Sequence, residues 1–176
     1  LMLEHPDEIV GGAKILLRAL GLPHGDIAIE DNKLDAADSI SAAIGDSPLL
    51  RVRIMRTKYP QGDERQLIFA LTGREIPEGK LPADVGCVVF NVETCSAIYR
   101  AFAEGMPLIE RCVTVDGDCI AEPRNLRVPL GTSVRELIEY CGGLTDVPFK
   151  VINGGPMMGA AIWDFDAPIA KGTSAI

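Results

Sequence analysis

The sequence lacks two features that define large classes of proteins. Its apolar runs, such as residues 85–90, are far shorter than the roughly 20 residues that a membrane-spanning helix needs. Positive charge is also scarce, because 17 Lys and Arg stand against 25 Asp and Glu and leave a net charge of −8. A chain this acidic offers no surface that neutralises nucleic-acid phosphates. We therefore expect neither a membrane span nor a nucleic-acid partner.

Patterns typical of metal sites and of hydrolases are missing as well. None of the five cysteines forms a C-x-x-C pair, whereas zinc and iron–sulfur sites favour closely spaced thiolates. The Gly-x-Ser-x-Gly motif of hydrolases is absent too. We therefore predict no metal site and no catalytic residue here, and interpret the cysteines as free thiols of a reducing cytoplasm. These cysteines are Cys87, Cys95, Cys112, Cys119 and Cys141.

The start of the chain also carries information. Leu1 is not an initiator residue, and no charged segment followed by an apolar stretch precedes the first predicted helix. We therefore expect no signal peptide and interpret the chain as a piece of a longer polypeptide. Its 176 residues suffice for one medium domain or two small ones.

Residues 1–108 alternate between helical and extended patterns. Helices are predicted over 6–20, 33–44, 62–72 and 91–104, and strands over 27–29, 50–55 and 86–90. Pro6 suits the start of the first helix, Gly21 its end, and Asn32 is predicted to cap the second helix. The apolar stripe of the first helix consists of Ile9, Ala13, Leu16, Leu17 and Leu20. Helices alternating with strands through short loops indicate an α/β layer with a largely parallel sheet.

The pattern changes after Pro107. Strands are predicted over 109–115, 119–121, 126–130 and 149–152, and a helix over 133–141. Asp116 and Gly117 indicate a hairpin, and Ser133 with Glu136 forms a capping box. This order resembles a small β-grasp unit, in which one helix crosses a mixed sheet. We therefore predict domains over 1–108 and 109–162, followed by a linker segment over 163–176.

Two helix starts are candidate binding sites. Asn91 follows a predicted strand and opens a helix, where free N–H groups attract anions, although it could merely cap its own helix. Gly62 would let a ligand approach the backbone closely, whereas Asp63 and Glu64 could be ordinary acids of a first helical turn. Lys58, Arg65 and Arg74 are interpreted as solvated charges. Residues 154–159 lack the Lys-Ser/Thr ending of a phosphate loop, so a turn is favoured there.

Four motifs together resemble the C subunit of the Rnf electron-transport complex, which is similar in turn to the flavin- and NADH-binding subunit of respiratory complex I. They are Met2-Leu3-Glu4-His5-Pro6, Lys58-Tyr59-Pro60-Gln61-Gly62-Asp63-Glu64-Arg65-Gln66-Leu67, Asn91-Val92-Glu93-Thr94 and Gly154-Gly155-Pro156-Met157-Met158-Gly159. The resemblance covers essentially the whole chain. It implies a partial Rossmann-like flavin-binding domain followed by a β-grasp domain of the soluble-ligand-binding (SLBB) type. It also implies a peripheral bacterial protein at the cytoplasmic face of the membrane, which passes electrons between NADH and ferredoxin with ion-translocating partner subunits.

The resemblance assigns site residues one by one. Gly62, Asp63 and Glu64 match the family's loop beside the flavin, and Asn91 and Thr94 match its segment near the flavin phosphate. Phe90 stands where the complex I relatives have a second asparagine. The family's glycine-rich loop for FMN and NADH is expected before Leu1, and its two [4Fe–4S] clusters after Ile176. We therefore expect an incomplete site that holds FMN weakly and is inactive alone. Two other interpretations stay open, a docking module without cofactor and a cobalamin-reducing flavoprotein.

Overall fold

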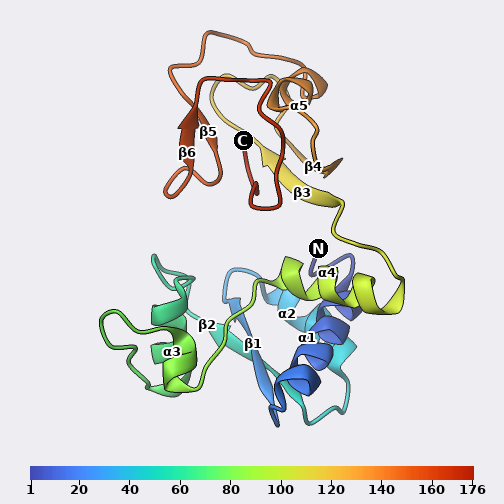
Figure 1. Cartoon of the computed structure of the whole chain (residues 1–176), viewed down its shortest axis with the longest axis vertical. Coiled ribbons are helices and arrows are strands. Elements are labelled where there is room, and N and C mark those ends of the chain that lie inside the picture. The colour runs from blue at the N-terminus through green and yellow to red at the C-terminus, as the bar shows by residue number, and fades with distance from the viewer. The chain divides into compact units, whose positions relative to one another are not determined.

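A computed structural model describes all 176 residues, which divide into two compact units, Leu1–Pro107 and Leu108–Ile176 (Figure 1). The first unit contains α1 (Pro6–Leu20), β1 (Gly25–Glu30), α2 (Leu34–Ile44), β2 (Leu50–Met55), α3 (Glu64–Thr72), the 3-10 turn η1 (Pro82–Val85) and α4 (Val92–Ala103). The second contains β3 (Glu110–Val115), β4 (Arg124–Pro129), α5 (Val134–Tyr140), β5 (Val151–Asn153) and β6 (Ala160–Ile162).

A parallel pair of strands lies at the centre of the first unit. β1 and β2 pair from Gly25 opposite Leu50 to Glu30 opposite Met55, and α2 forms the crossover between them. Ile27 and Ile29 of β1 are buried together with Ile9 of α1 and Ile40 of α2. Burying β-branched side chains between a strand pair and two helices is the usual way in which an α/β layer is stabilised. The predicted α/β architecture is therefore confirmed.

Two glycines allow α1 and α4 to lie side by side (Figure 1). A Cβ atom on Gly12 would stand 1.8 Å from the carbonyl oxygen of Cys95, and one on Gly11 would stand 2.3 Å from the Tyr99 ring. The side chains also interact across this contact, because the Ser96 hydroxyl donates a hydrogen bond to the Glu8 carboxylate. The close approach buries Cys95, and burial raises the pKa of its thiol.

Three expectations for the first unit are wrong. Residues 86–90 form no strand, because no neighbouring strand pairs with them in these 176 residues. The N-cap of α2 is Lys33 rather than Asn32, and it makes no side-chain capping bond. Leu20, predicted to be buried, is 47% exposed. Its side chain lines a pocket at the side of the sheet rather than the packed core.

The second unit is built on an antiparallel pair, β3 with β4, packed against α5. Val113, Val134, Cys141 and Ile169 are almost fully buried in its core. The predicted capping box is confirmed, because the Ser133 hydroxyl accepts from the Glu136 amide while the Glu136 carboxylate accepts from the Ser133 amide. The predicted strand over 119–121 is wrong. Its residue Ile120 makes only an isolated bridge with Leu144, and β3 pairs with β4 instead.

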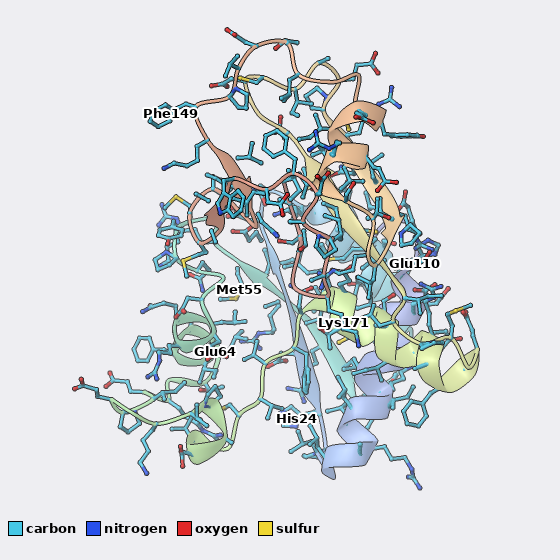
Figure 2. All side chains as sticks on the ribbon, turned by 45° about the horizontal axis from the view of Figure 1, so that its top comes forward. His24, Met55, Glu64, Glu110, Phe149 and Lys171 are labelled. Carbon is cyan, nitrogen blue, oxygen red and sulfur yellow. The ribbon has the colours of Figure 1, made fainter.

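The end of the chain packs into the second unit. Ile169 N donates to the Thr132 carbonyl at 2.7 Å, and Ile176 N donates to the Thr114 carbonyl at 2.8 Å. Residues 163–176, for which the sequence suggests a linker, are therefore held by main-chain hydrogen bonds. The short hairpin of β5 and β6 is joined to this end of the chain, because Gly154 N donates to the Ala175 carbonyl at 2.8 Å. Residues 154–159 form the favoured turn between its strands. Phe149, just before β5, is fully exposed and points into solvent (Figure 2).

Candidate functional site

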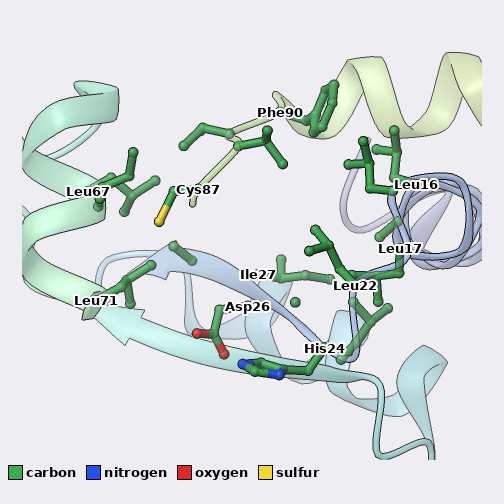
Figure 3. A pocket seen from close by; sticks show the side chains of 18 of the residues that line it. Leu16, Leu17, Leu22, His24, Asp26, Ile27, Leu67, Leu71, Cys87 and Phe90 are labelled. Atoms are coloured by element: carbon green, nitrogen blue, oxygen red, sulfur yellow. The ribbon is translucent and has the colours of Figure 1, made fainter. Parts of the chain in front are cut away.

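A pocket of about 500 Å³ lies in the first unit, between β1 and the extended residues 86–90 (Figure 3). α1 and α3 form its other two sides. Most of the lining side chains are aliphatic, and the acidic or basic ones are His24, Asp26 and Arg74. A volume of this size falls within the range of small-molecule sites, but the lining offers few polar groups that would orient a ligand. The five site residues assigned from the sequence are not among those that line this pocket.

Asn91 lies at one end of the pocket, because the residues on either side of it, Phe90 and Val92, both line the pocket wall. It is the N-cap of α4, and its side-chain oxygen accepts the Glu93 amide at 2.9 Å. Thr94 is exposed in the first turn of the same helix. One capping bond leaves other first-turn N–H groups of α4 without helical partners, and the helix dipole adds positive potential there. This helix end can therefore bind an anion.

Gly62, Asp63 and Glu64 open α3. Asp63 is its N-cap, and one carboxylate oxygen accepts the amides of Arg65 at 3.1 Å and Gln66 at 3.2 Å. Glu64 is exposed in the first turn (Figure 2). A Cβ atom on Gly62 would meet no atom within 4 Å, so the backbone there is open to a ligand. Asp63 can therefore cap α3 and also face a ligand, because both capping bonds use the same one of its two carboxylate oxygens.

Gln61, directly before this loop, is a further candidate, which the sequence analysis placed within a motif but gave no role. The residue is 6% exposed, and its side-chain amide nitrogen has no hydrogen-bond partner among these residues. A buried donor without a partner costs about 1–3 kcal/mol. A group outside this chain, from a ligand or from further polypeptide, would remove that cost. The burial of Gln61 depends on how the loop folds, so no local signal indicates it.

Arg65 and Arg74 are structural rather than merely solvated, contrary to the sequence-based interpretation. Arg65 donates to the Ile76 carbonyl at 3.1 Å and to the Lys80 carbonyl at 2.8 Å. Arg74 donates to the Val85 carbonyl at 2.8 Å, directly before the pocket wall. The two guanidinium groups therefore hold the loop that carries the chain from α3 to residues 86–90.

The carboxyl ends of β1 and β2 are joined by a side chain. One oxygen of Asp31 accepts the Thr57 hydroxyl at 2.7 Å and the Thr57 amide at 3.0 Å. The hydroxyl first, and then the amide, hold the pKa of the Asp31 carboxyl below its ordinary value. This edge is where ligands bind in open α/β sheets. Asp31 was not among the residues predicted from the sequence, although an acid directly after a predicted strand could have indicated it.

Comparison with known proteins shows which family the chain belongs to. Residues 1–100 match the family described as the Nuo51 FMN-binding domain. The chain belongs to this family. Residues 112–161 match the SLBB domain, which confirms the predicted order of a flavin-binding domain and a β-grasp domain.

The chain is also similar to the C subunits of ion-translocating complexes. The C subunit of the proton-translocating ferredoxin:NAD(+) oxidoreductase complex of Clostridium ljungdahlii is 47% identical over 99% of this chain and 38% of that protein. The C subunit of the Na(+)-translocating complex of Acetobacterium woodii is 44% identical over 100% of this chain and 40% of that protein. These relatives confirm the resemblance found in the motifs. The chain spans 40% or less of their length.

Solved structures agree on the fold. A chain of the NAD+-reducing [NiFe]-hydrogenase in the air-oxidized state matches 99% of this chain and 35% of its own length, with a TM-score of 0.79 and 20% identity. At this identity the likeness shows the fold alone. No helix of the structure is long and apolar enough to span a bilayer. No three His, Cys, Asp or Glu side chains gather into a possible metal site.

Proposed function

We propose that this chain is the flavin-binding part of an electron-transfer subunit in an ion-translocating ferredoxin:NAD oxidoreductase. The observation that carries the proposal is the match of residues 1–100 to an FMN-binding domain, in which α4 presents an anion-attracting N-terminus at Asn91. The names of the relatives supply the reaction class. The flavin-binding part comprises residues 1–108 and the β-grasp part residues 109–162.

The residues present fit FMN. The N-terminus of α4, with Asn91 and Thr94, suits the phosphate. The open backbone at Gly62 lets the flat ring approach, and the orphaned amide of buried Gln61 lies directly beside it in sequence. Asp63 and Glu64 would repel a phosphate, so they suit the uncharged ring end. When bound, the flavin supplies the chemistry that links a two-electron donor to one-electron acceptors.

The remaining parts of the proposal concern the longer protein. We infer that it also binds NADH and carries two [4Fe–4S] clusters toward ferredoxin, outside residues 1–176. Its partners are the other subunits of the complex, and its place is the cytoplasmic face of a bacterial membrane. The names of the relatives, which are subunits of such complexes, support this arrangement.

The substitution Asn91→Asp tests the phosphate assignment in the longer protein. Aspartate caps a helix as well as asparagine does, so the stability of α4 is kept. It places a negative charge beside the phosphate, and we expect FMN to bind about tenfold more weakly, which corresponds to about 1.4 kcal/mol. Quenching of flavin fluorescence measures the Kd.

Asn125→Asp is the matched control, because Asn125 is exposed on β4 of the second unit and caps no helix. We expect this variant to bind FMN like the unchanged protein. Equal affinities of both variants for FMN would contradict the assignment of Asn91 to the phosphate.

A further inference from the structure

The helix α3 lies outside the core that holds the rest of the first unit together. Its buried residue, Ile68, does not belong to the cluster formed by α1, α2, β1, β2 and Cys95 of α4. Figure 1 shows α3 to one side of the strand pair, away from α1. Packing within that core therefore does not fix where α3 begins, and the segment that joins β2 to α3 has to do so.

The segment between β2 and α3 is folded into two successive tight turns. Gln61 N donates to the Lys58 carbonyl at 2.9 Å, and Asp63 N donates to the Pro60 carbonyl at 2.8 Å. Bonds from residue i+3 back to residue i close β-turns. Because the segment has this fixed shape, the position of its first residues determines the position of Gly62 and of the α3 N-terminus.

One carboxylate ties this segment to the strand pair. The same oxygen of Asp31 accepts the Thr57 hydroxyl at 2.7 Å and the Thr57 amide at 3.0 Å. Asp31 is itself fixed, because it follows β1 directly and its amide donates to the Met55 carbonyl at 2.8 Å. Hydrogen bonds to an ionised carboxylate are stronger than those between neutral groups. No other side-chain hydrogen bond joins residues 56–62 to the rest of the chain.

We propose that Asp31 is a positioning residue for the flavin loop, residues 57–62, which it holds in place through Thr57. This inference deepens the proposed function and rests on it, because the backbone at Gly62 is where the flavin ring approaches. Asp31 acts on the flavin only through the loop. A loop that is already held in its bound arrangement loses less freedom when the ligand arrives, so the ligand binds more tightly.

The Asp31 side chain has two other interpretations. It could serve only the turn that follows β1, but that turn is closed by Lys33 N, which donates to the Glu30 carbonyl at 3.0 Å and does not use the carboxylate. It could also contact the flavin directly with its second oxygen. A negative charge there would repel the flavin phosphate, and substitution by asparagine separates direct contact from positioning.

The affinity of the longer protein for FMN tests the proposal. Asp31→Ala removes both bonds to Thr57, and we expect the Kd, measured by quenching of flavin fluorescence, to rise about tenfold. Asp31→Asn keeps an oxygen that can accept both bonds, and we expect a Kd within about threefold of the unchanged protein. Asp38→Ala is the control, because Asp38 is exposed on α2. An unchanged Kd in Asp31→Ala would overturn the proposal, and so would an equal loss in Asp31→Asn, in favour of direct contact.

Hydrogen exchange without flavin measures the hold on the loop by itself. In Asp31→Ala we expect the amides of Gln61 and Asp63 to exchange about tenfold faster or more, because the turns are no longer tied to the strands. The amide of Ile40, buried in α2, is the internal control and should keep its rate. Unchanged exchange at both loop amides would overturn the proposal, as would faster exchange with an unchanged Kd. If the unchanged protein bound no FMN, the proposed function would fail, and the exchange rates would still show whether Asp31 holds the loop.

Thr57 supplies the last test, because Asp31 is proposed to act through this residue. Thr57→Val removes the hydroxyl bond and keeps the amide bond, so we expect a smaller rise of the Kd for FMN, about threefold. Once Asp31→Ala has removed both bonds, Thr57→Val has none left to remove. We therefore expect the double variant to bind FMN like Asp31→Ala alone. Effects that multiply in the double variant would overturn the proposal.

Discussion

At the residue scale, the Asp31 carboxylate shows how one side chain ties the ends of two strands together. Its oxygen accepts both the hydroxyl and the amide of Thr57, and these bonds lower the pKa of Asp31. We predict that Thr57→Val raises this pKa toward its ordinary value, because the hydroxyl bond is the largest cause of the shift. A carboxyl-carbon NMR titration of Asp31 measures the change.

The sign of the accompanying pH effect follows from the depressed pKa. Stability from Asp31 is fully present above the pKa of the unfolded chain, about 3.9, and is lost as the pH falls through the lower folded value. Thr57→Val should therefore flatten the loss of stability below about pH 4. Thr132→Val is the control, because the Thr132 hydroxyl donates to the Pro129 carbonyl rather than to a carboxylate. An unmoved Asp31 titration in Thr57→Val would contradict the prediction.

At the scale of elements, the contact of α1 with α4 depends on Gly12. We predict that Gly12→Ala destabilises the first unit by about 2 kcal/mol, because the added Cβ meets the Cys95 carbonyl oxygen, a backbone atom that cannot rotate away. Gly11→Ala is the matched comparison. Its Cβ meets the Tyr99 ring, which can turn, and alanine gains up to about 1 kcal/mol of helix propensity over glycine. Urea unfolding followed by circular dichroism should separate the two variants, and equal midpoints would contradict the prediction.

The elements also show what a sequence can predict. Helix starts at Asp63, Asn91 and Ser133 were predictable within two residues, because a cap is a local arrangement of a side chain and nearby amides. The strand over 86–90 was not, since a strand needs a partner that may lie anywhere in the chain. Its apolar run correctly indicated extended chain, and these residues line the pocket beside β1 instead of joining the sheet.

The same difference between local and long-range structure decides which residues of the candidate site could be predicted. The motifs around Gly62 and Asn91 were visible because each is one continuous segment. Gln61, Asp31 and the guanidinium bonds of Arg74 were missed, because their roles depend on segments that meet only after folding. Helix caps can therefore be predicted from the sequence, whereas burial and long-range hydrogen bonds cannot.

At the scale of the whole molecule, the affinity for FMN depends on how much of the site these residues supply. The α4 N-terminus and one side-chain hydrogen bond from Asn91 are worth about 1 kcal/mol each in a half-exposed site. Association costs roughly 4–15 kcal/mol in lost translational and rotational freedom. Asp63 and Glu64 add repulsion if the phosphate approaches them. The favourable contributions of residues 1–176 to the binding free energy are therefore smaller than the free energy lost on association.

We predict that residues 1–176 alone bind FMN too weakly to saturate at micromolar concentration, whereas the longer protein binds it tightly. The difference arises because the longer polypeptide is expected to add further hydrogen-bond donors for the flavin. Titration of both proteins with FMN, followed by flavin fluorescence, measures the two affinities. Saturable micromolar quenching by residues 1–176, lost in Asn91→Ala, would show that the segments around Gly62 and Asn91 suffice for binding, because the helix end then contributes far more than an exposed dipole does.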